Sequence, residues 1–146
     1  MRTDMETKNE LFPTKLIIYT DGGSRGNPGP AALGVVVGER PYGMVIGHAT
    51  NNVAEYSAIV FALKKAKQLL GKTKAKQTDI EVRMDSELAM KQLTGKYKIE
   101  NPDLQPLFLE VWNLRLDFKS VSFVHVPREE NTKADAMVNK ALDNEL

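Results

Sequence analysis

The stretch Leu16–Pro30 constrains the fold of this chain more than any other. An apolar run, Leu16-Ile17-Ile18-Tyr19, leads into Asp21, and the next nine residues contain four glycines and two prolines. β-Branched and aromatic residues followed by turn formers predict a strand over Lys15–Asp21 that ends in a turn. An acid at the end of an apolar strand is well placed to hold a metal ion or to meet a reacting phosphate. The function of the chain therefore depends on which other acids can reach Asp21.

The rest of the sequence predicts one α/β domain. Further apolar runs with a period of two indicate strands, and apolar residues at helical spacing indicate helices. The order of the elements favours a mixed sheet with helices packed on its faces. The further strands are Ala31–Gly38, Tyr42–Ala49, Ile80–Asp85 and Lys119–Val126, and the helices run from the cap Thr50-Asn51-Asn52 to about Leu70, over Ser86–Leu93, from Pro102 to about Asp117 and from the cap Asn131 to Leu142, with a basic loop over Gly71–Thr78.

Length and composition agree with a single globular domain. The chain has 146 residues, of which 42% are hydrophobic and 27% charged, and this is enough to bury a core. We expect a flexible tail over residues 1–14 and one domain over 15–146. The formal charge of +1 requires any nucleic-acid binding to come from local patches.

Several classes of protein are excluded by what the sequence lacks. It contains no cysteine, which excludes disulfides, thiolate zinc sites and a cysteine nucleophile. No apolar run approaches the length of a membrane span, and Met1–Glu10 is too charged for a signal peptide. We therefore expect a cytoplasmic protein without a membrane partner, and we expect a monomer.

Four carboxylates stand out by their positions in the predicted elements. Asp21 and Asp85 each end an apolar strand, and Glu55 and Asp135 each lie in the first turn of a helix. Taken singly, each has an ordinary explanation, because aspartate is common after strands and acids stabilise helix N-termini. The helical pair is less ordinary, since each of its acids shares a side of its helix with the apolar residues.

Inward-facing carboxylates are costly unless they are paired or bind a cation. Glu55 is four residues before Ile59, and Asp135 is three residues before Val138, so both are expected on the packed side. The sequence offers no comparable set of inward bases, and hard oxygen ligands select Mg²⁺ or Mn²⁺. Four such acids can hold two ions roughly 4 Å apart and clamp a phosphodiester for attack by water.

The segments around these acids resemble the motifs of type 1 ribonuclease H, in the order and at the intervals of that family. The resemblance implies a ribonuclease H-like fold, a five-stranded mixed sheet of order 3-2-1-4-5 flanked by helices. It implies two-metal, Mg²⁺- or Mn²⁺-dependent endonucleolytic hydrolysis of the RNA strand of RNA–DNA hybrids, which leaves 5′-phosphate products. Asp21, Glu55, Asp85 and Asp135 would be its catalytic, metal-binding carboxylates. The matching segments are Tyr19-Thr20-Asp21-Gly22-Gly23, Gly26-Asn27-Pro28-Gly29, Thr50-Asn51-Asn52-Val53-Ala54-Glu55, Met84-Asp85-Ser86 and Asn131-Thr132-Lys133-Ala134-Asp135.

The same resemblance implies contacts to the sugars and phosphates of the hybrid. Such contacts read the 2′-hydroxyls and the shape of the duplex, not its sequence. Helix capping is the alternative role for Thr50-Asn51-Asn52, and Asn131 is either a cap or a neighbour of the active site. The expected substrate contacts are Gly22, Gly23, Ser24, Arg25, Asn27, Thr50, Asn51, Asn52, Lys96, Tyr97, Lys98, Arg128 and Asn131.

Two departures from the family pattern affect the expected substrate contacts. Many members carry a basic helical protrusion, for which the interval Ser86–Asn101 is too short. The stretch from Lys91 through Lys96, Tyr97 and Lys98 is the candidate substitute, and a solvated loop is the alternative. Short chains without a protrusion are similar to the archaeal-like branch of the family.

The second departure is the histidine loop before the last acid. The segment Val126–Glu130 is short and contains no histidine. Arg128 is the candidate electrostatic substitute, and His125 is expected to be structural. His48, in the third strand, is not expected to be a ligand, and Trp112 is expected to pack in the core.

Two other functions fit the same residues. One is a non-catalytic protein that binds hybrids or double-stranded RNA. The other is a different nuclease of the same superfamily, such as an integrase or a junction resolvase. The presence of all four acids argues against the first, and the glycine-rich turn with Thr50-Asn51-Asn52 argues against the second.

Overall fold

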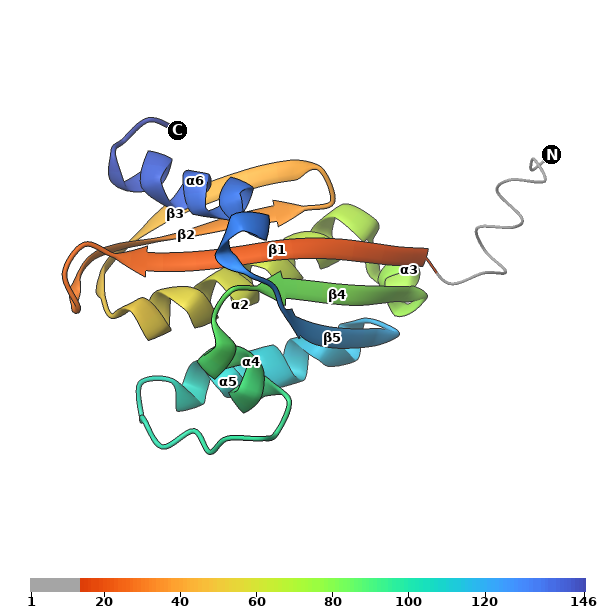
Figure 1. The fold of residues 1–146 in the computed structure, drawn as a ribbon. Helices are drawn as coiled ribbons and strands as arrows, with labels where there is room; N and C mark the ends of the chain where they lie inside the picture. Colours follow the sequence, from red (N-terminus) through yellow and green to blue (C-terminus); the bar gives the residue numbers. More distant parts are fainter. Residues whose placement is uncertain (1–13) are drawn as a thin grey trace.

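The computed structural model describes residues 14–146 and confirms the predicted architecture. Five strands form one mixed sheet in the order β3-β2-β1-β4-β5 (Figure 1). β1 pairs antiparallel with β2 and parallel with β4. The strands are β1 (Thr14–Ser24), β2 (Gly29–Val37), β3 (Arg40–Ala49), β4 (Thr78–Met84) and β5 (Ser120–His125).

Helices cover the two faces of the sheet unequally. α2 crosses one face under β1 and β2, with α4 and α5 beside it, whereas α6 lies on the other face over β2 and β3 (Figure 1). The main core lies between the sheet and α2, because apolar side chains from both elements are fully buried there. The helices are α2 (Asn51–Leu70), α3 (Lys72–Lys76), α4 (Glu87–Leu93), α5 (Gln105–Leu114) and α6 (Thr132–Leu142), with short 3₁₀ turns η1 (Arg115–Asp117) and η2 (Arg128–Glu130).

The sheet contains a notch where β4 stops. The last pair between β1 and β4 is Thr20 with Met84, but β1 continues to Ser24 paired with β2 alone. Beyond Thr20, no strand within residues 14–146 separates the two faces of the sheet on that side of β1. Side chains from both faces can therefore meet beside Asp21, which lies inside β1 and not at its tip as the sequence suggested. The antiparallel partner β2 extends the strand, because it supplies hydrogen bonds to the glycines that were expected to begin a turn.

Two glycines allow helices to approach the notch from opposite faces. A Cβ on Gly22 would overlap the backbone of Ala54 in α2, and one on Gly34 would overlap the carbonyl of Ala134 in α6. Gly34 pairs directly with Asp21 across the β1–β2 ladder. The absence of side chains at these two positions brings the first turns of α2 and α6 close to Asp21.

Several expected boundaries differ from the structure. The expected basic loop contains α3, because Ala75 is fully buried and the Thr78 hydroxyl donates to the Lys74 carbonyl at 2.7 Å. The helix expected from Pro102 begins at Gln105 and ends as a 3₁₀ turn. Thr14 already belongs to β1, so the expected tail of residues 1–14 otherwise lies outside the described residues.

Trp112 does not pack in the core as predicted. It is 39% exposed, and Leu116 on the same side is 61% exposed. The buried side of α5 is the one that carries Val111, and adjacent residues on a helix point about 100° apart. Trp112 instead stacks on Phe108 with ring centroids 5.4 Å apart and lies against the guanidinium of Arg115 at 3.5 Å. Among residues 14–146, no helix has the length and apolar character needed to cross a membrane.

Candidate active site

All four predicted carboxylates line one cavity at the notch. This cavity has a volume of about 280 Å³, and Asp21, Glu55, Asp85 and Asp135 all contribute to its wall. Asp21 comes from β1, Asp85 follows the end of β4, and Glu55 and Asp135 come from the first turns of α2 and α6. The structure thus brings together acids that are up to 114 positions apart in the sequence, as the spacing argument predicted.

The pKa values of two of these acids, Asp21 and Glu55, are raised above their ordinary values. Burial, then the charges of Asp85 and Asp135, raise the pKa of Asp21 from 3.8 to about 8. Burial also raises the pKa of Glu55, although a hydrogen bond from Ser86 opposes this shift. Both shifts have the sign expected when negative charges are held together without a compensating cation.

The donor set fits hard divalent cations. Carboxylate oxygens are the ligands that Mg²⁺ and Mn²⁺ prefer, and a bound cation would offset the burial and the repulsion that together raise the pKa of Asp21. Within residues 14–146, no three acidic or histidine side chains already form a closed ligand cage. Their carboxylates surround the cavity instead of converging on one point.

Asp135 differs from the prediction in its exposure. The sequence placed it on the packed side of its helix, but the structure leaves it exposed, while Ala134 and Val138 are buried. The spacing of Asp135 from the apolar residues predicted the packed side of α6 with an error of one residue, because α6 packs on the sheet through the preceding residue, Ala134. Asp135 consequently faces the open cavity, where solvent and a substrate can reach it.

The hairpin between β1 and β2 is tied to the start of α2 by two asparagines. Asn51 Oδ1 accepts from the Ser24 N–H at 2.9 Å, and Asn27 Oδ1 accepts from the Asn51 N–H at 3.0 Å. Thr50 caps α2 through its hydroxyl, which accepts from the Val53 N–H at 3.2 Å. Ser24 and Asn51 line the cavity, whereas Thr50, Asn52 and Asn27 lie outside its lining.

The predicted glycine contacts are of two kinds. Gly22 is buried against α2, so its packing role explains the glycine without a substrate. Gly23 is partly exposed, and both residues contribute backbone to the cavity wall. The close approach that the sequence suggested for a nucleic-acid backbone is, at Gly22, an approach of the protein's own helix.

Asn131 is a buried tether beside the active site and not a helix cap. Its side chain makes no capping hydrogen bond to α6, and it is only 1% exposed. Its Nδ2 donates to the Thr20 carbonyl at 2.9 Å. Because Thr20 precedes Asp21 and Asn131 precedes α6, this bond fixes the start of α6 against β1. The side chain is buried in this structure, and its expected role as a substrate contact stays a prediction.

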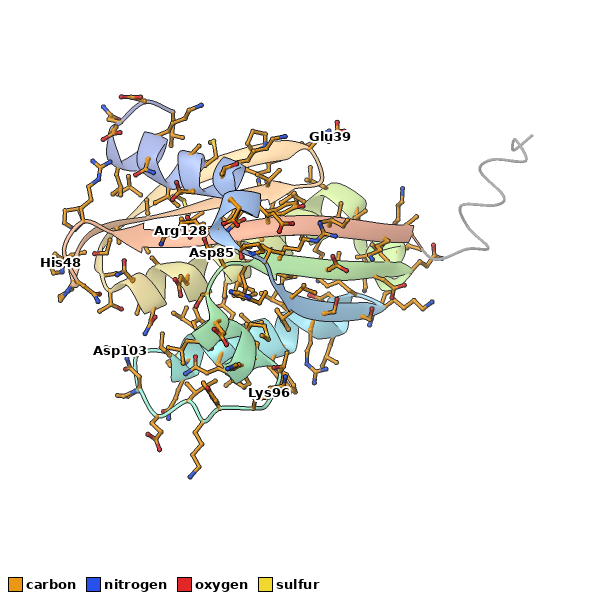
Figure 2. The ribbon with its side chains drawn as sticks, in the orientation of Figure 1. Glu39, His48, Asp85, Lys96, Asp103 and Arg128 are labelled. Atoms are coloured by element: carbon orange, nitrogen blue, oxygen red, sulfur yellow. The ribbon has the colours of Figure 1, made fainter. Side chains whose placement is uncertain are left out.

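Arg25 and Arg128 both border the cavity, as expected, but the basic loop does not. In Figure 2 Asp85 and Arg128 lie close together near the end of β4, and both line the cavity. Lys96 lies well away from them, on the loop beyond α4 (Figure 2). This loop is nevertheless anchored, since Gln92 accepts from the Tyr56 hydroxyl at 2.7 Å and donates to the Lys98 carbonyl at 3.3 Å.

The remaining aromatic and basic side chains of that loop are exposed. Tyr97 is exposed, and its hydroxyl lies 3.3 Å from Lys91 Nζ. Lys96 and Lys98 are exposed as well. Lys91, in the last turn of α4, is half-buried and pairs with Glu87 at 2.8 Å, so the exposed ammonium groups are those of Lys96 and Lys98. We call Lys91, Lys96, Tyr97 and Lys98 the basic loop surface.

Neither histidine belongs to the cavity lining. His125 is exposed at the end of β5, and its charge acts on Glu87, so its expected structural role is not supported by burial. His48 is exposed in β3 beside Pro30.

Three residues that sequence reasoning did not select take part in the site. Ser86 hydrogen-bonds to Glu55 and caps α4 through the Ala89 N–H at 3.1 Å. Asn139 lines the cavity one turn after Asp135, a spacing that could have identified it. Asp143 pairs with Arg25 at 2.7 Å, and no local sequence signal connects two residues this far apart.

Comparison with known proteins identifies the family of the chain. A family model described as reverse transcriptase-like matches residues 19–141. Ribonuclease HI of Halobacterium salinarum is 45% identical over 132 residues, which cover 86% of this chain and 63% of that protein. The bifunctional protein Rv2228c of Mycobacterium tuberculosis is 42% identical over 136 residues, which cover 88% of this chain and 36% of that protein. This chain thus spans only part of the length of both relatives.

Solved structures give the same assignment. The crystal structure of RNase H1 from Halobacterium salinarum matches with a TM-score of 0.80 at 43% identity and covers 89% of this chain and 98% of that one. LC11-RNase H1 in complex with an RNA/DNA hybrid matches with a TM-score of 0.83 at 42% identity and covers 88% of this chain and 97% of that one. The sheet order, the four acids in one cavity and these similarities together establish that the chain belongs to the type 1 ribonuclease H family.

Proposed function

We propose that this chain is a metal-dependent endonuclease that hydrolyses the RNA strand of RNA–DNA hybrids. The observation that carries the proposal is the cavity in which Asp21, Glu55, Asp85 and Asp135 meet. Four hard oxygen donors beside an open cavity suit two Mg²⁺ or Mn²⁺ ions, which would supply an activated water and neutralise charge on the phosphate. The related LC11 enzyme was solved with an RNA/DNA hybrid, which supports the same class of substrate here.

The positions of the carboxylates in the cavity would give them different roles. Asp21 lies in β1, between the helices that bring Glu55 and Asp135 from the two faces of the sheet, so it would help to hold a cation with either of them. Ser86 holds the carboxyl of Glu55 through a hydrogen bond. Asp135 is exposed at the mouth of the cavity, where it would face the phosphate and the entering water.

The asparagines of the hairpin would contact the sugars of the hybrid. The Oδ1 atoms of Asn27 and Asn51 accept backbone hydrogen bonds at 3.0 and 2.9 Å, and these bonds fix the orientation of both amides. Their Nδ2 groups are then left as donors for 2′-hydroxyl, sugar or phosphate oxygens. This arrangement supports recognition of an RNA strand by its 2′-hydroxyls.

The basic loop surface would contact the other strand. Lys96 and Lys98 offer positive charge and Tyr97 offers a ring, whereas Lys91 is already paired with Glu87 at 2.8 Å. The hydrogen bond from Gln92 to the Lys98 carbonyl holds this loop in place. Phosphate contacts of this kind position a duplex without reading its sequence. Double-stranded RNA, which shares the A-form backbone, is the natural competitor.

The test is a substrate panel with matched variants. Labelled RNA–DNA hybrid, double-stranded RNA, duplex DNA and branched DNA are incubated with Mg²⁺ or Mn²⁺. We expect cutting of the RNA in the hybrid, with 5′-phosphate products, and loss of at least about a hundredfold in kcat for Asp21→Asn. The matched control Asp103→Asn alters an exposed acid that Figure 2 places away from the cavity, and it should cut like the parent.

Other outcomes of the panel would replace the proposal. Binding of the hybrid without cutting under either cation indicates a non-catalytic binder. Preferential cutting of branched DNA indicates another nuclease of the superfamily. Equal activity of the parent and Asp21→Asn would remove Asp21 from the catalytic set.

A further inference from the structure

The two arginines that border the cavity differ in their surroundings. Arg128 lies on η2 and forms no ion pair within residues 14–146. Arg25, at the end of the β1–β2 hairpin, is already paired, because its Nη1 lies 2.7 Å from Oδ1 of Asp143. One cation is therefore available to a phosphate, and the other is held by a carboxylate of the protein itself.

Asp143 occupies an unfavourable position for an acid. It follows the last turn of α6, and its N–H donates to the Asn139 carbonyl at 2.9 Å. A carboxylate at a helix C-terminus meets the negative end of the helix dipole, where basic residues such as Lys140 are preferred. An acid at this position therefore does not stabilise α6, whereas it does form an ion pair with Arg25.

A ligand can replace Asp143 as the partner of Arg25. The side chains of Arg25 and Asp143 are 48% and 43% exposed, so water and ligands reach both partners. Exposed ion pairs of this kind are weak. A guanidinium accepts a phosphate or a carboxylate in the same geometry, so a phosphate oxygen can take the place of Asp143 without rearrangement of the hairpin.

We propose that Asp143 is an affinity-determining residue that competes with a substrate phosphate for Arg25. In the free protein, Asp143 neutralises the guanidinium of Arg25, which borders the cavity. A nucleic acid that binds there must displace Asp143 from Arg25 or forgo that contact. The proposal rests on the nuclease function proposed above, and it adds an internal limit on how tightly the substrate is held.

Asp143→Asn tests the proposal, because it keeps the size of the side chain and removes its charge. Binding of a labelled RNA–DNA hybrid is measured by fluorescence anisotropy in EDTA over a range of salt concentrations, and cleavage kinetics are measured with Mg²⁺. We expect the variant to bind about two- to fivefold more tightly, the factor that release of an exposed ion pair allows. The plot of log affinity against log salt should steepen by about 0.9, as one more phosphate contact forms. KM should fall by the same factor, with kcat unchanged.

Three further variants isolate the pair from the overall charge. Arg25→Ala leaves Asp143 unpaired and should weaken binding slightly, and Arg25→Ala combined with Asp143→Asn should at most restore the affinity of the parent, because no guanidinium is then released to the phosphate. Glu110→Gln is the matched control, because Glu110 pairs with Lys64 at 2.7 Å with similar exposures of 40% and 58%. It lies outside the cavity lining and should bind like the parent.

The results that would overturn the proposal are specific. Unchanged or weaker binding by Asp143→Asn shows that Asp143 does not compete or that it orients Arg25 productively. A gain over the parent that persists without Arg25, or that Glu110→Gln reproduces, shows a bulk charge effect. These binding results are independent of turnover, so a parent that binds the hybrid without cutting it refutes the proposed nuclease and leaves the competition to be decided by the binding series.

Discussion

At the scale of single residues, the carboxylates of the site repel one another, and a hydrogen bond from Asn131 helps to hold the elements that carry them in place. Asp21 is half-buried beside two other acids, and its raised pKa records the cost of ionising it there. Asn131 opposes the disorder that such repulsion favours, because its amide links β1 to the start of α6. The fold thus holds these acids together against their own charge, which is the arrangement that the proposed binding of cations requires.

The pKa of Asp21 predicts how stability depends on pH in the absence of divalent cations. The folded protein keeps the proton up to pH about 8, whereas the ordinary value is 3.8. Between these values the unfolded chain releases a proton that the folded chain retains, so stability falls as pH rises from about 4 to about 8. Asp21→Asn removes this loss and should melt higher than the parent at pH 8, by about 2–4 °C for each kcal/mol relieved.

Thermal melts of both proteins in EDTA at pH 4 and pH 8 check this prediction. The difference in Tm should be small at pH 4 and larger at pH 8. A difference of the same size at both values would show that ionisation of Asp21 is not its cause.

Removal of the Asn131 tether should lower both stability and turnover. In Asn131→Ala the buried Thr20 carbonyl loses its partner, which costs about 1–3 kcal/mol. The start of α6 would then be less well fixed, so kcat should fall more than KM rises. Urea unfolding and cleavage kinetics measure the two effects, and the exposed Asn113→Ala on α5 is the control. Full activity in a destabilised Asn131→Ala would restrict the residue to a folding role.

At the scale of elements, two close helix approaches build the active site. α2 and α6 reach Asp21 from opposite faces of the sheet because Gly22 and Gly34 leave room for their backbones. β4 ends at Met84, so the two faces meet in one cavity. The glycine of the segment Tyr19–Gly23 that lies beside Asp21 is thus a contact between β1 and α2.

Gly34→Ala should separate packing from chemistry, since Gly34 carries no functional group. Its Cβ would overlap the Ala134 carbonyl and lie 2.8 Å from the Val138 N–H. α6 must therefore shift, which should cost about 1–3 kcal/mol, as overpacking does, and should displace Asp135. We expect a lower Tm together with a loss of kcat that higher Mg²⁺ partly restores.

Gly47→Ala is the comparison for this change. Gly47 also lies in the sheet, and nothing lies within 4 Å of an added Cβ, although its φ of +87° adds local strain. It should lose stability but keep the kcat of the parent. Equal losses of kcat in both variants would refute the positioning of α6 by Gly34.

At the scale of the whole molecule, the binding surface is local because the net charge is only +1. Acids occupy the cavity, Arg25 and Arg128 its border, and the basic loop surface lies beyond α4. A duplex that contacted both places would be aligned across the notch by phosphate contacts. The fold supplies this alignment, since α2 carries both Glu55 and the Tyr56 hydroxyl that holds the loop through Gln92.

Divalent cations should stabilise the whole protein through these acids. A ligand that binds the folded chain alone adds about 2.7 kcal/mol of stability at a hundred times its Kd. The parent should therefore melt higher as Mg²⁺ or Mn²⁺ is added, and Asp21→Asn should respond much less. Melting curves over a cation titration test this, with Asp103→Asn expected to follow the parent. The same shift in Tm for Asp21→Asn would place the cations elsewhere.

The sequence by itself determined the fold class, the strand order through its family motifs, and the set of four acids. These features depend on local periodicity and on motif order, which are readable without contacts. Asp21 could be assigned to a strand, but its place inside β1 depends on pairing with β2. Trp112 had the right spacing for a core residue, yet the side of α5 that faces the core depends on how the helix is rotated.

Only the tertiary structure decided which residues near the site bind each other. Gly22 packs against α2, Asn131 holds a β1 carbonyl, and Arg25 is paired with Asp143. Each of these contacts joins segments distant in the chain, and their energies depend on distance and burial that no local pattern encodes. The sequence therefore determined which functional groups the site contains, and packing decided which of them remain free of contacts with other residues of the protein.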